Sequence, residues 1–104
     1  MSRTTRFILL ITVAIGASPA MAITAEDVLE KMSKDQQFGY LTGLIDMLAY
    51  KELLEGDKPY AQCLSDAFYK DKTMSERIFS SLRAYPDKAP EGIIYLLMMK
   101  ACGR

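Results

Sequence analysis

The sequence has no histidine among its 104 residues. Without an imidazole the chain cannot build the Ser–His or Cys–His pairs that activate a nucleophile. It also lacks a glycine-rich stretch with the spacing of a phosphate-binding loop. A lone carboxylate such as Asp46 then has few partners for general acid–base chemistry. The sequence therefore favours a protein that binds over one that catalyses a reaction, and no cofactor is expected.

A long membrane-spanning run is also missing, since a bilayer takes about 20 apolar residues. The apolar run at residues 7–17 has 11 residues, follows two arginines and precedes Ala-Met-Ala at residues 20–22. These are the three parts of a secretory signal peptide, so we expect residues 1–22 to be removed by cleavage after Ala22. The alternative is an uncleaved N-terminal anchor. Cleavage leaves one domain, residues 23–104, in the periplasm and without a stable membrane anchor.

The sequence has no excess of either charge, with 13 basic and 13 acidic residues. Without residues 1–22, which contain two arginines and no acidic residue, the net charge is −2. A nucleic-acid-binding domain would need a basic face, and a helix that binds anionic membranes would also be basic. The charge balance leaves a protein as the expected partner.

Cysteine is scarce, with only Cys63 and Cys102. Small exported domains often add a disulfide because their cores are modest. Two cysteines allow one intramolecular pair, and a loop of this length gives a chain-entropy stabilisation of about 4 kcal/mol. The spacing excludes a CxxC redox centre. The alternative to the predicted disulfide is two free buried thiols.

No stretch alternates with a period of two, and residues 23–104 are predicted to be helical. We expect an all-α fold, a small disulfide-clamped bundle of four to five short helices after the signal peptide. The first helix is expected to be capped by Thr24, and the second to run from a cap at Asp35 to an end near Leu54 and Gly56. The third is expected to start at Pro59, and the fourth to begin with a capping box of Thr73 and Glu76 and to stop at Pro86. The last is expected to start at Pro90 and to end at Cys102.

The helix expected between residues 35 and 54 is apolar over a wide arc and is predicted to be the central, buried one. Its two apolar faces are Phe38, Leu41, Ile45 and Leu48, and Tyr40, Leu44 and Met47. Gly39 and Gly43 share a face, which predicts close contact with another backbone, expected to be that of the last helix. The alternative is that both glycines merely tolerate a crowded position.

Asp46 lies near the same side of that helix and is predicted to be a structural carboxylate. The expected partners are backbone donors at a helix start, Tyr40, Tyr95, Arg77 or Arg83. A catalytic role for Asp46 is the alternative. Copper binding by the thioethers of Met47, Met98 and Met99 is a further alternative, but methionine at helical spacing is more often core, and no metal is expected.

Several residues keep a recognisable order along the chain. Residues 39–46 read G-Y-x-x-G-x-x-D, a Cys-Leu pair follows at residue 63, a capped helix ends in Tyr-Pro, and a closing helix ends in cysteine. The pattern, carried by Gly39, Tyr40, Gly43, Asp46, Cys63, Pro86 and Cys102, resembles the Rap/Tai family of small periplasmic immunity proteins. That resemblance implies binding and inhibition of a peptidoglycan amidase delivered by type VI secretion.

The expected partner surface is polar and lies around residues 51–58 and 70–73. Its candidate residues are Lys51, Glu52, Glu55, Asp57, Lys58, Lys70, Asp71 and Lys72. A homodimer stays open as a further assembly. The alternative function is that of a periplasmic acid-stress chaperone resembling the HdeA group, which would open as its carboxylates become protonated at low pH.

Overall fold

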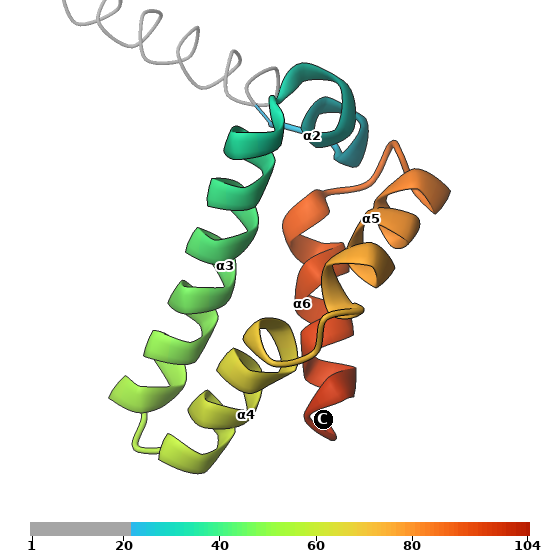
Figure 1. The fold of residues 1–104 in the computed structure, drawn as a ribbon. Coiled ribbons are helices and arrows are strands. Elements are labelled where there is room, and N and C mark those ends of the chain that lie inside the picture. The colour runs from blue at the N-terminus through green and yellow to red at the C-terminus, as the bar shows by residue number, and fades with distance from the viewer. Residues whose placement is uncertain (1–21) are drawn as a thin grey trace, which may run out of the picture.

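The structure, a computed structural model, describes residues 22–104, which form five α-helices and no strand (Figure 1). The helices are α2 (Ala25–Lys31), α3 (Lys34–Leu54), α4 (Lys58–Tyr69), α5 (Met74–Ala84) and α6 (Pro90–Ala101). The all-α prediction is confirmed for this part of the chain. Residues 1–21, nearly all of the expected signal peptide, lie outside the described residues, so export and cleavage stay predictions.

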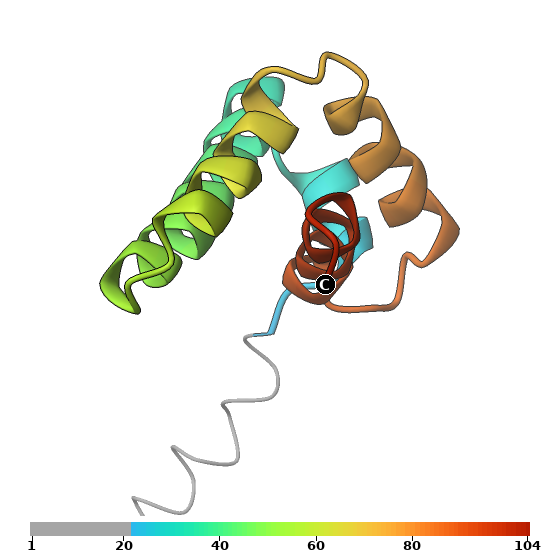
Figure 2. The same cartoon turned by 90° about the horizontal axis from the view of Figure 1, so that it is seen from below.

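The helices pack as an antiparallel pair joined to a second group (Figures 1 and 2). Helices α3 and α4 lie side by side, α6 lies between α4 and α5, and α2 packs against α5. All five helices contribute to one core of buried side chains, which are Ala25, Val28, Leu41, Ile45, Leu64, Phe68, Met74, Ile78, Leu82, Ile94 and Met98. Within residues 22–104, no helix has both the length and the apolarity that a bilayer crossing requires.

Local sequence signals set most of the helix ends. Thr24 caps α2 as predicted, and Gly56 ends α3 with a φ of +87° that glycine adopts without strain. The cap of α3 is Ser33, with Gln36 completing the capping box, so the prediction for Asp35 was wrong by two positions. The residue pair Ser33 and Gln36 has the S-x-x-Q form of that motif.

The capping box expected at the start of α5 does not form. Thr73 makes no side-chain cap on α5, and its backbone lies in the αR region, with φ −91° and ψ −10°, instead of the extended conformation usual for an N-cap residue. Its hydroxyl donates to Asp71 Oδ1 at 2.7 Å. The Thr73 backbone N–H donates to the same oxygen at 2.9 Å. The bond from the Thr73 N–H to the carboxylate two residues earlier is an Asx turn, which orders the residues that lead into α5.

The predicted disulfide is confirmed. Cys63 on α4 bonds to Cys102, the residue that ends α6, with their Cα atoms 5.9 Å apart. It links α4 to the end of α6 across 39 residues of sequence, and no free cysteine is found among the described residues. The bundle is thus closed covalently on the side where α4 meets α6.

Helix α3 is not the central buried helix that its composition predicts. Leu41 and Ile45 are buried, but Phe38 and Met47 are 62% and 63% exposed. The reason is that α3 packs mainly on α4 and forms an edge of the bundle (Figure 1). Its apolar residues run around the whole helix, while only one side meets the core.

The expected close contact at the two glycines was also wrong. A Cβ added at Gly39 or Gly43 would have no atom within 4 Å, so neither glycine faces another backbone. Both lie on the outer side of α3, turned away from Leu41 and Ile45. The last helix, expected to contact them, instead packs on α4 and α5.

Helix α2 is held by hydrogen bonds at both of its ends. The backbone N–H groups of Ala25 and Glu26 donate to the carbonyls of Lys88 and Pro86, at 2.8 and 2.9 Å. At the other end, Gln37 Nε2 on α3 donates to the carbonyl of Val28 at 2.9 Å. These bonds satisfy groups that a helix terminus otherwise leaves without partners.

Candidate functional site

Asp46 is exposed on α3 and has a partner that the sequence analysis did not name. The hydroxyl of Tyr69, near the end of α4, donates to Asp46 Oδ1 at 2.9 Å. Partial burial, followed by this bond to Asp46, raises the pKa of the Tyr69 hydroxyl. The carboxylate thus links α3 to α4, whereas Tyr95, Arg77 and the other expected partners form no hydrogen bond with it among the described residues.

Tyr40 and Pro86, the other motif residues, also make contacts between helices. The Tyr40 hydroxyl lies 3.3 Å from Glu91 Oε2 at the start of α6. Burial, with Glu91 as the second cause, raises the pKa of Tyr40 to about 12, so this phenol stays protonated at neutral pH. Pro86 begins the turn after α5, and its carbonyl accepts the bond from the Glu26 N–H. These residues hold the fold together.

The two segments of the expected partner surface lie at opposite ends of α4. Residues 51–58 comprise the last turn of α3, the α3–α4 turn and the first residue of α4, and residues 70–73 lead from α4 to α5 (Figure 1). A helix of 12 residues is about 18 Å long, so the two clusters do not merge into one polar patch. They are therefore two separate sites, which we call the α3–α4 turn cluster and the α4–α5 loop cluster.

The charged residues of the α3–α4 turn cluster form ion pairs mainly with one another and with Arg104. Glu52 is only 7% exposed and its Oε1 lies 3.2 Å from Arg104 Nη1. Asp57 caps α4 and its Oδ2 lies 2.8 Å from Arg104 Nη2. Lys51 pairs with Glu55 at 2.8 Å. Most charges of this cluster are thus used within the fold.

In the α4–α5 loop cluster, two of the three charged side chains form ion pairs among the described residues. Asp71 accepts from Thr73 and pairs with Arg77, whose Nη2 lies 2.7 Å from Asp71 Oδ2. The bonds from Thr73, and then Arg77, lower the pKa of Asp71. Lys70 lies 3.5 Å from Asp66, whereas Lys72 is exposed and forms no ion pair within the described residues. Lys72 is therefore the charge of this cluster best placed for a partner.

Lys72 lies at the rim of a groove between α3, α4 and α5. The half of the groove beside Lys72 has a volume of about 420 Å³. Its walls are largely aromatic, with Phe38, Phe68, Tyr69 and Phe79, and its rim carries Lys34, Asp71 and Lys72. Phe38 and Tyr69 are 62% and 49% exposed. Exposed aromatic rings beside charged groups are typical of protein interfaces.

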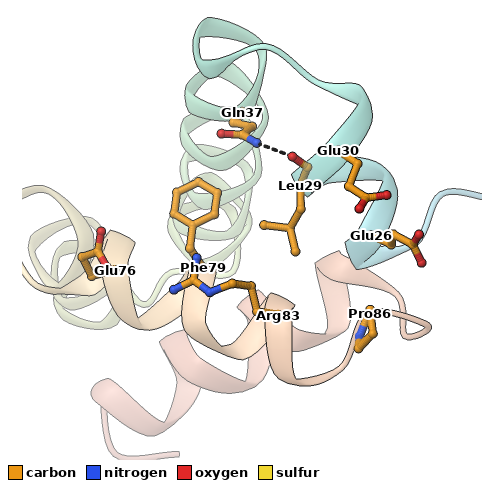
Figure 3. Close-up of a pocket in the computed structure, with 8 residues that line it drawn as sticks. All are labelled: Glu26, Leu29, Glu30, Gln37, Glu76, Phe79, Arg83 and Pro86. Carbon is orange, nitrogen blue, oxygen red and sulfur yellow. Dashed lines mark hydrogen bonds between the residues drawn. The ribbon is translucent and has the colours of Figure 1, made fainter.

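The same groove continues past Gln37 and Phe79 into a more polar half. Figure 3 shows this half, of about 680 Å³, between α2, α3 and α5. It adds Glu26, Leu29, Glu30, Glu76, Arg83 and Pro86. The hydrogen bond and charge of Glu30 raise the pKa of Glu26. Gln37 and Phe79 line both halves, so the two halves are adjacent, and we call them together the α3–α5 groove.

Sequence reasoning missed this groove, although it named Asp71 and Lys72 at its rim. Its walls come from residues up to 60 positions apart, such as Glu26 and Pro86, and no local motif connects them. Phe38 was expected to be core, and its exposure gives the groove its apolar character. A surplus of aromatic residues beyond what the core needs is the sequence signal that could have indicated it.

No cluster of three potential carboxylate, cysteine or histidine ligands occurs among residues 22–104. The methionines considered for copper do not meet, since Met98 is fully buried and Met47 lies on the outer side of α3.

A second apolar groove, of about 520 Å³, runs between α5 and α6 and includes Tyr85, Leu96 and Lys100.

Comparison of the chain with models of known protein families, with curated proteins and with solved structures finds no match.

Proposed function

We propose that this chain is a periplasmic immunity-type protein that binds a secreted peptidoglycan amidase and inhibits it by occupying its surface. The amidase is proposed from the sequence resemblance to the Rap/Tai family. The α3–α5 groove is the observation that carries the binding role, because it offers aromatic walls and a charged rim on a covalently closed scaffold.

The groove suits a protruding loop of a partner protein. Its two halves together extend along α3 and α5, and exposed Phe38 stands at the aromatic half. Aromatic side chains in such clefts supply most of the binding energy at many interfaces. The carboxylates of Glu26, Glu30 and Glu76 at the other half favour a partner segment that carries lysine or arginine.

Rigidity supports inhibition by binding. The disulfide joins α4 to the end of α6, and Gln37 Nε2 on α3 donates to the Leu29 carbonyl of α2 at one wall of the groove (Figure 3). A preformed surface loses less conformational entropy on association than a mobile one. An interface of about 800 Å² on each partner is sufficient for a specific inhibitor.

The test uses the oxidised, exported protein and the secreted amidases encoded in the same genome. We expect stoichiometric binding and loss of peptidoglycan cleavage for one amidase. Phe38→Ser should weaken that binding by at least about tenfold, since hot-spot aromatics contribute about 2 kcal/mol or more. Leu96→Ser, at a residue 67% exposed on α6, is the matched control and should bind normally.

Two results would overturn the proposal. If no secreted amidase binds or is inhibited at micromolar concentrations, the immunity role is wrong. If Leu96→Ser abolishes binding and Phe38→Ser does not, the partner uses the groove between α5 and α6, and the assignment of the α3–α5 groove is wrong.

A further inference from the structure

Helix α6 has apolar residues on two sides, and only one of these sides meets the core. Ile94 and Met98 are fully buried. The other side lines the second apolar groove, of about 520 Å³, which we call the α5–α6 groove. There Ile93 and Leu97 are half-buried, and Leu96 is 67% exposed. Apolar side chains that repeat at helical spacing outside the core indicate a surface that binds something.

The α5–α6 groove has the size and width of a site for a thin, apolar ligand. Its volume lies in the range of about 300–1,000 Å³ that is typical of small-molecule sites. A Cβ added at Gly92, which lines the groove, would meet no atom within 4 Å, so open space reaches the α6 backbone there. The axes of two packed helices are about 8–10 Å apart, which is too close for a third helix of about 10–12 Å diameter to enter between them. An unbranched alkyl chain is thin enough to reach Gly92.

The charges of the α5–α6 groove are all positive. Lys88 and Lys100 line it at its two ends, whereas no carboxylate of residues 22–104 does so. Neither lysine forms an ion pair within this part of the chain. The acidic neighbours of Lys88 in sequence, Asp87 and Glu91, do not line the groove, and Glu91 Oε2 lies 3.3 Å from the Tyr40 hydroxyl. The groove is therefore complementary to an apolar molecule that carries a negative charge.

The end of the groove at Lys88 is best placed to hold that charge. The Lys88 N–H donates to the Tyr85 carbonyl at 3.2 Å, and such a turn keeps the two Cα atoms within about 7 Å. The Lys88 carbonyl also accepts from the Ala25 N–H at 2.8 Å, which fixes the turn to α2. An ammonium and a phenol hydroxyl, both hydrogen-bond donors, thus stand at one end of the groove. Lys100 lies in the last turn of α6, where a cation stabilises the negative end of the helix dipole.

We propose that the α5–α6 groove binds a free fatty acid, with the carboxylate between Lys88 and Tyr85 and the alkyl chain along α6 toward Lys100. The ten residues from Pro90 to Lys100 rise by about 15 Å, close to the extended length of dodecanoate. The signal peptide predicts export to a compartment between two lipid membranes, whose acyl chains are the source of such ligands.

The α5–α6 groove and the α3–α5 groove lie on opposite sides of α5. Phe79 and Arg83 line the α3–α5 groove, whereas Ser81 and Tyr85 line the α5–α6 groove, and these pairs lie about half a turn apart. A fatty acid and a protein partner therefore do not compete for the same surface. This inference does not rest on the proposed function, because it concerns a different groove.

The test is calorimetric titration of the oxidised, exported protein with dodecanoate below its critical micelle concentration. We expect one site with a dissociation constant of roughly 10–100 µM. Octanoate should bind at least about tenfold more weakly, because it buries fewer methylene groups. Dodecyltrimethylammonium has the same chain with the opposite charge and should not bind in this range.

Two variants test the placement of the ligand. Gly92→Leu fills the open space with a side chain that favours helix, and should weaken dodecanoate binding at least about tenfold. Lys88→Gln removes the charge at the carboxylate and should weaken binding at least about fivefold. Lys58→Gln, the matched control, removes an exposed charge at the start of α4 and should bind as the parent does. Circular dichroism of each variant checks that the helices are retained.

Four results would overturn the proposal. The first two are no binding of dodecanoate up to its micelle concentration, and binding that is as strong in Gly92→Leu and Lys88→Gln as in the parent. The third is equally strong binding of dodecyltrimethylammonium, which would mean that the groove does not select the carboxylate. The fourth is binding of an acidic amphipathic peptide, sensitive to the same two variants, by a protein that does not bind dodecanoate; the groove would then be a protein-binding site.

Discussion

Arg104 Nη1 lies 3.2 Å from Glu52 Oε1, although 52 residues separate the two in sequence. The same guanidinium reaches Asp57 at 2.8 Å and lies 3.6 Å from the centroid of the Tyr60 ring. Glu52 is almost completely buried. A buried carboxylate is costly unless it is paired and hydrogen-bonded, so Arg104 makes the burial of Glu52 tolerable.

Arg104→Met should therefore lower the free energy of unfolding by about 1–3 kcal/mol, because it leaves Glu52 with only a 3.5 Å contact to Lys51. Urea denaturation of the oxidised protein measures the change. Arg104→Lys keeps the charge but not the two-pronged geometry, and should lose part of that stability. If Arg104→Met is as stable as the parent protein, the contact contributes nothing.

Cys102→Ser should destabilise the fold by about 2–5 kcal/mol, because it opens the loop that the disulfide closes. Mass spectrometry of the native protein before and after reduction should show a gain of two hydrogens. Cys63→Ser is the matched variant and should have the same effect, since both remove one bond. Free thiols in the exported protein would contradict the structure.

Gly43→Ala should stabilise the monomer by up to about 1 kcal/mol. Alanine is the better helix former, and the space around Gly43 is open. Thermal unfolding of the oxidised parent protein and variant gives the relevant comparison. A lower melting temperature for the variant would mean that another backbone does approach Gly43, as the sequence alone predicted.

Stability should fall at alkaline pH because of Tyr40. The folded state raises the pKa of Tyr40 from 10.0 to about 12, so the fold favours the neutral phenol. The stabilisation from this shift is fully present below about pH 10 and is lost as the pH rises toward 12. Burial and the bond to Asp46 raise the pKa of Tyr69 as well, which adds to the same trend.

Tyr40→Phe should reduce the loss of stability between pH 10 and pH 12, and chemical denaturation at several pH values measures it. Tyr85→Phe, which changes an exposed ring, is the control and should follow the parent protein. An unchanged alkaline profile in Tyr40→Phe would show that Tyr40 does not cause the loss.

The sequence predicts the helix boundaries well because their signals are local. Pro59 and Pro90 lie in the first turns of their helices, and Gly56 follows α3 with the backbone geometry that ends a helix. The errors at Asp35 and Thr73 arose at helix starts that hold several polar side chains: Ser33 caps α3 in place of Asp35, and the Thr73 hydroxyl bonds to Asp71. Which side chain forms the cap is decided by geometry that the order of residues does not contain.

The orientation of α3 could not be predicted in the same way. Apolar residues surround this helix, so periodicity identifies a helix but not the side that faces the core. The pairing of Glu52 with Arg104 and the two halves of the α3–α5 groove depend on how distant segments meet. The same holds for the partner of Asp46, which is Tyr69 and not one of the tyrosine or arginine residues that the sequence predicted.

The hydrogen bonds that attach the start of α2 make its motion measurable by hydrogen exchange. Its first two amides, those of Ala25 and Glu26, are bonded to carbonyls of the turn between α5 and α6, outside α2 itself. Those amide protons can exchange with deuterium only when α2 separates from that turn, because no other event in the helix exposes them. Their exchange rates therefore report the free energy of separating α2, which lines the α3–α5 groove, from that turn.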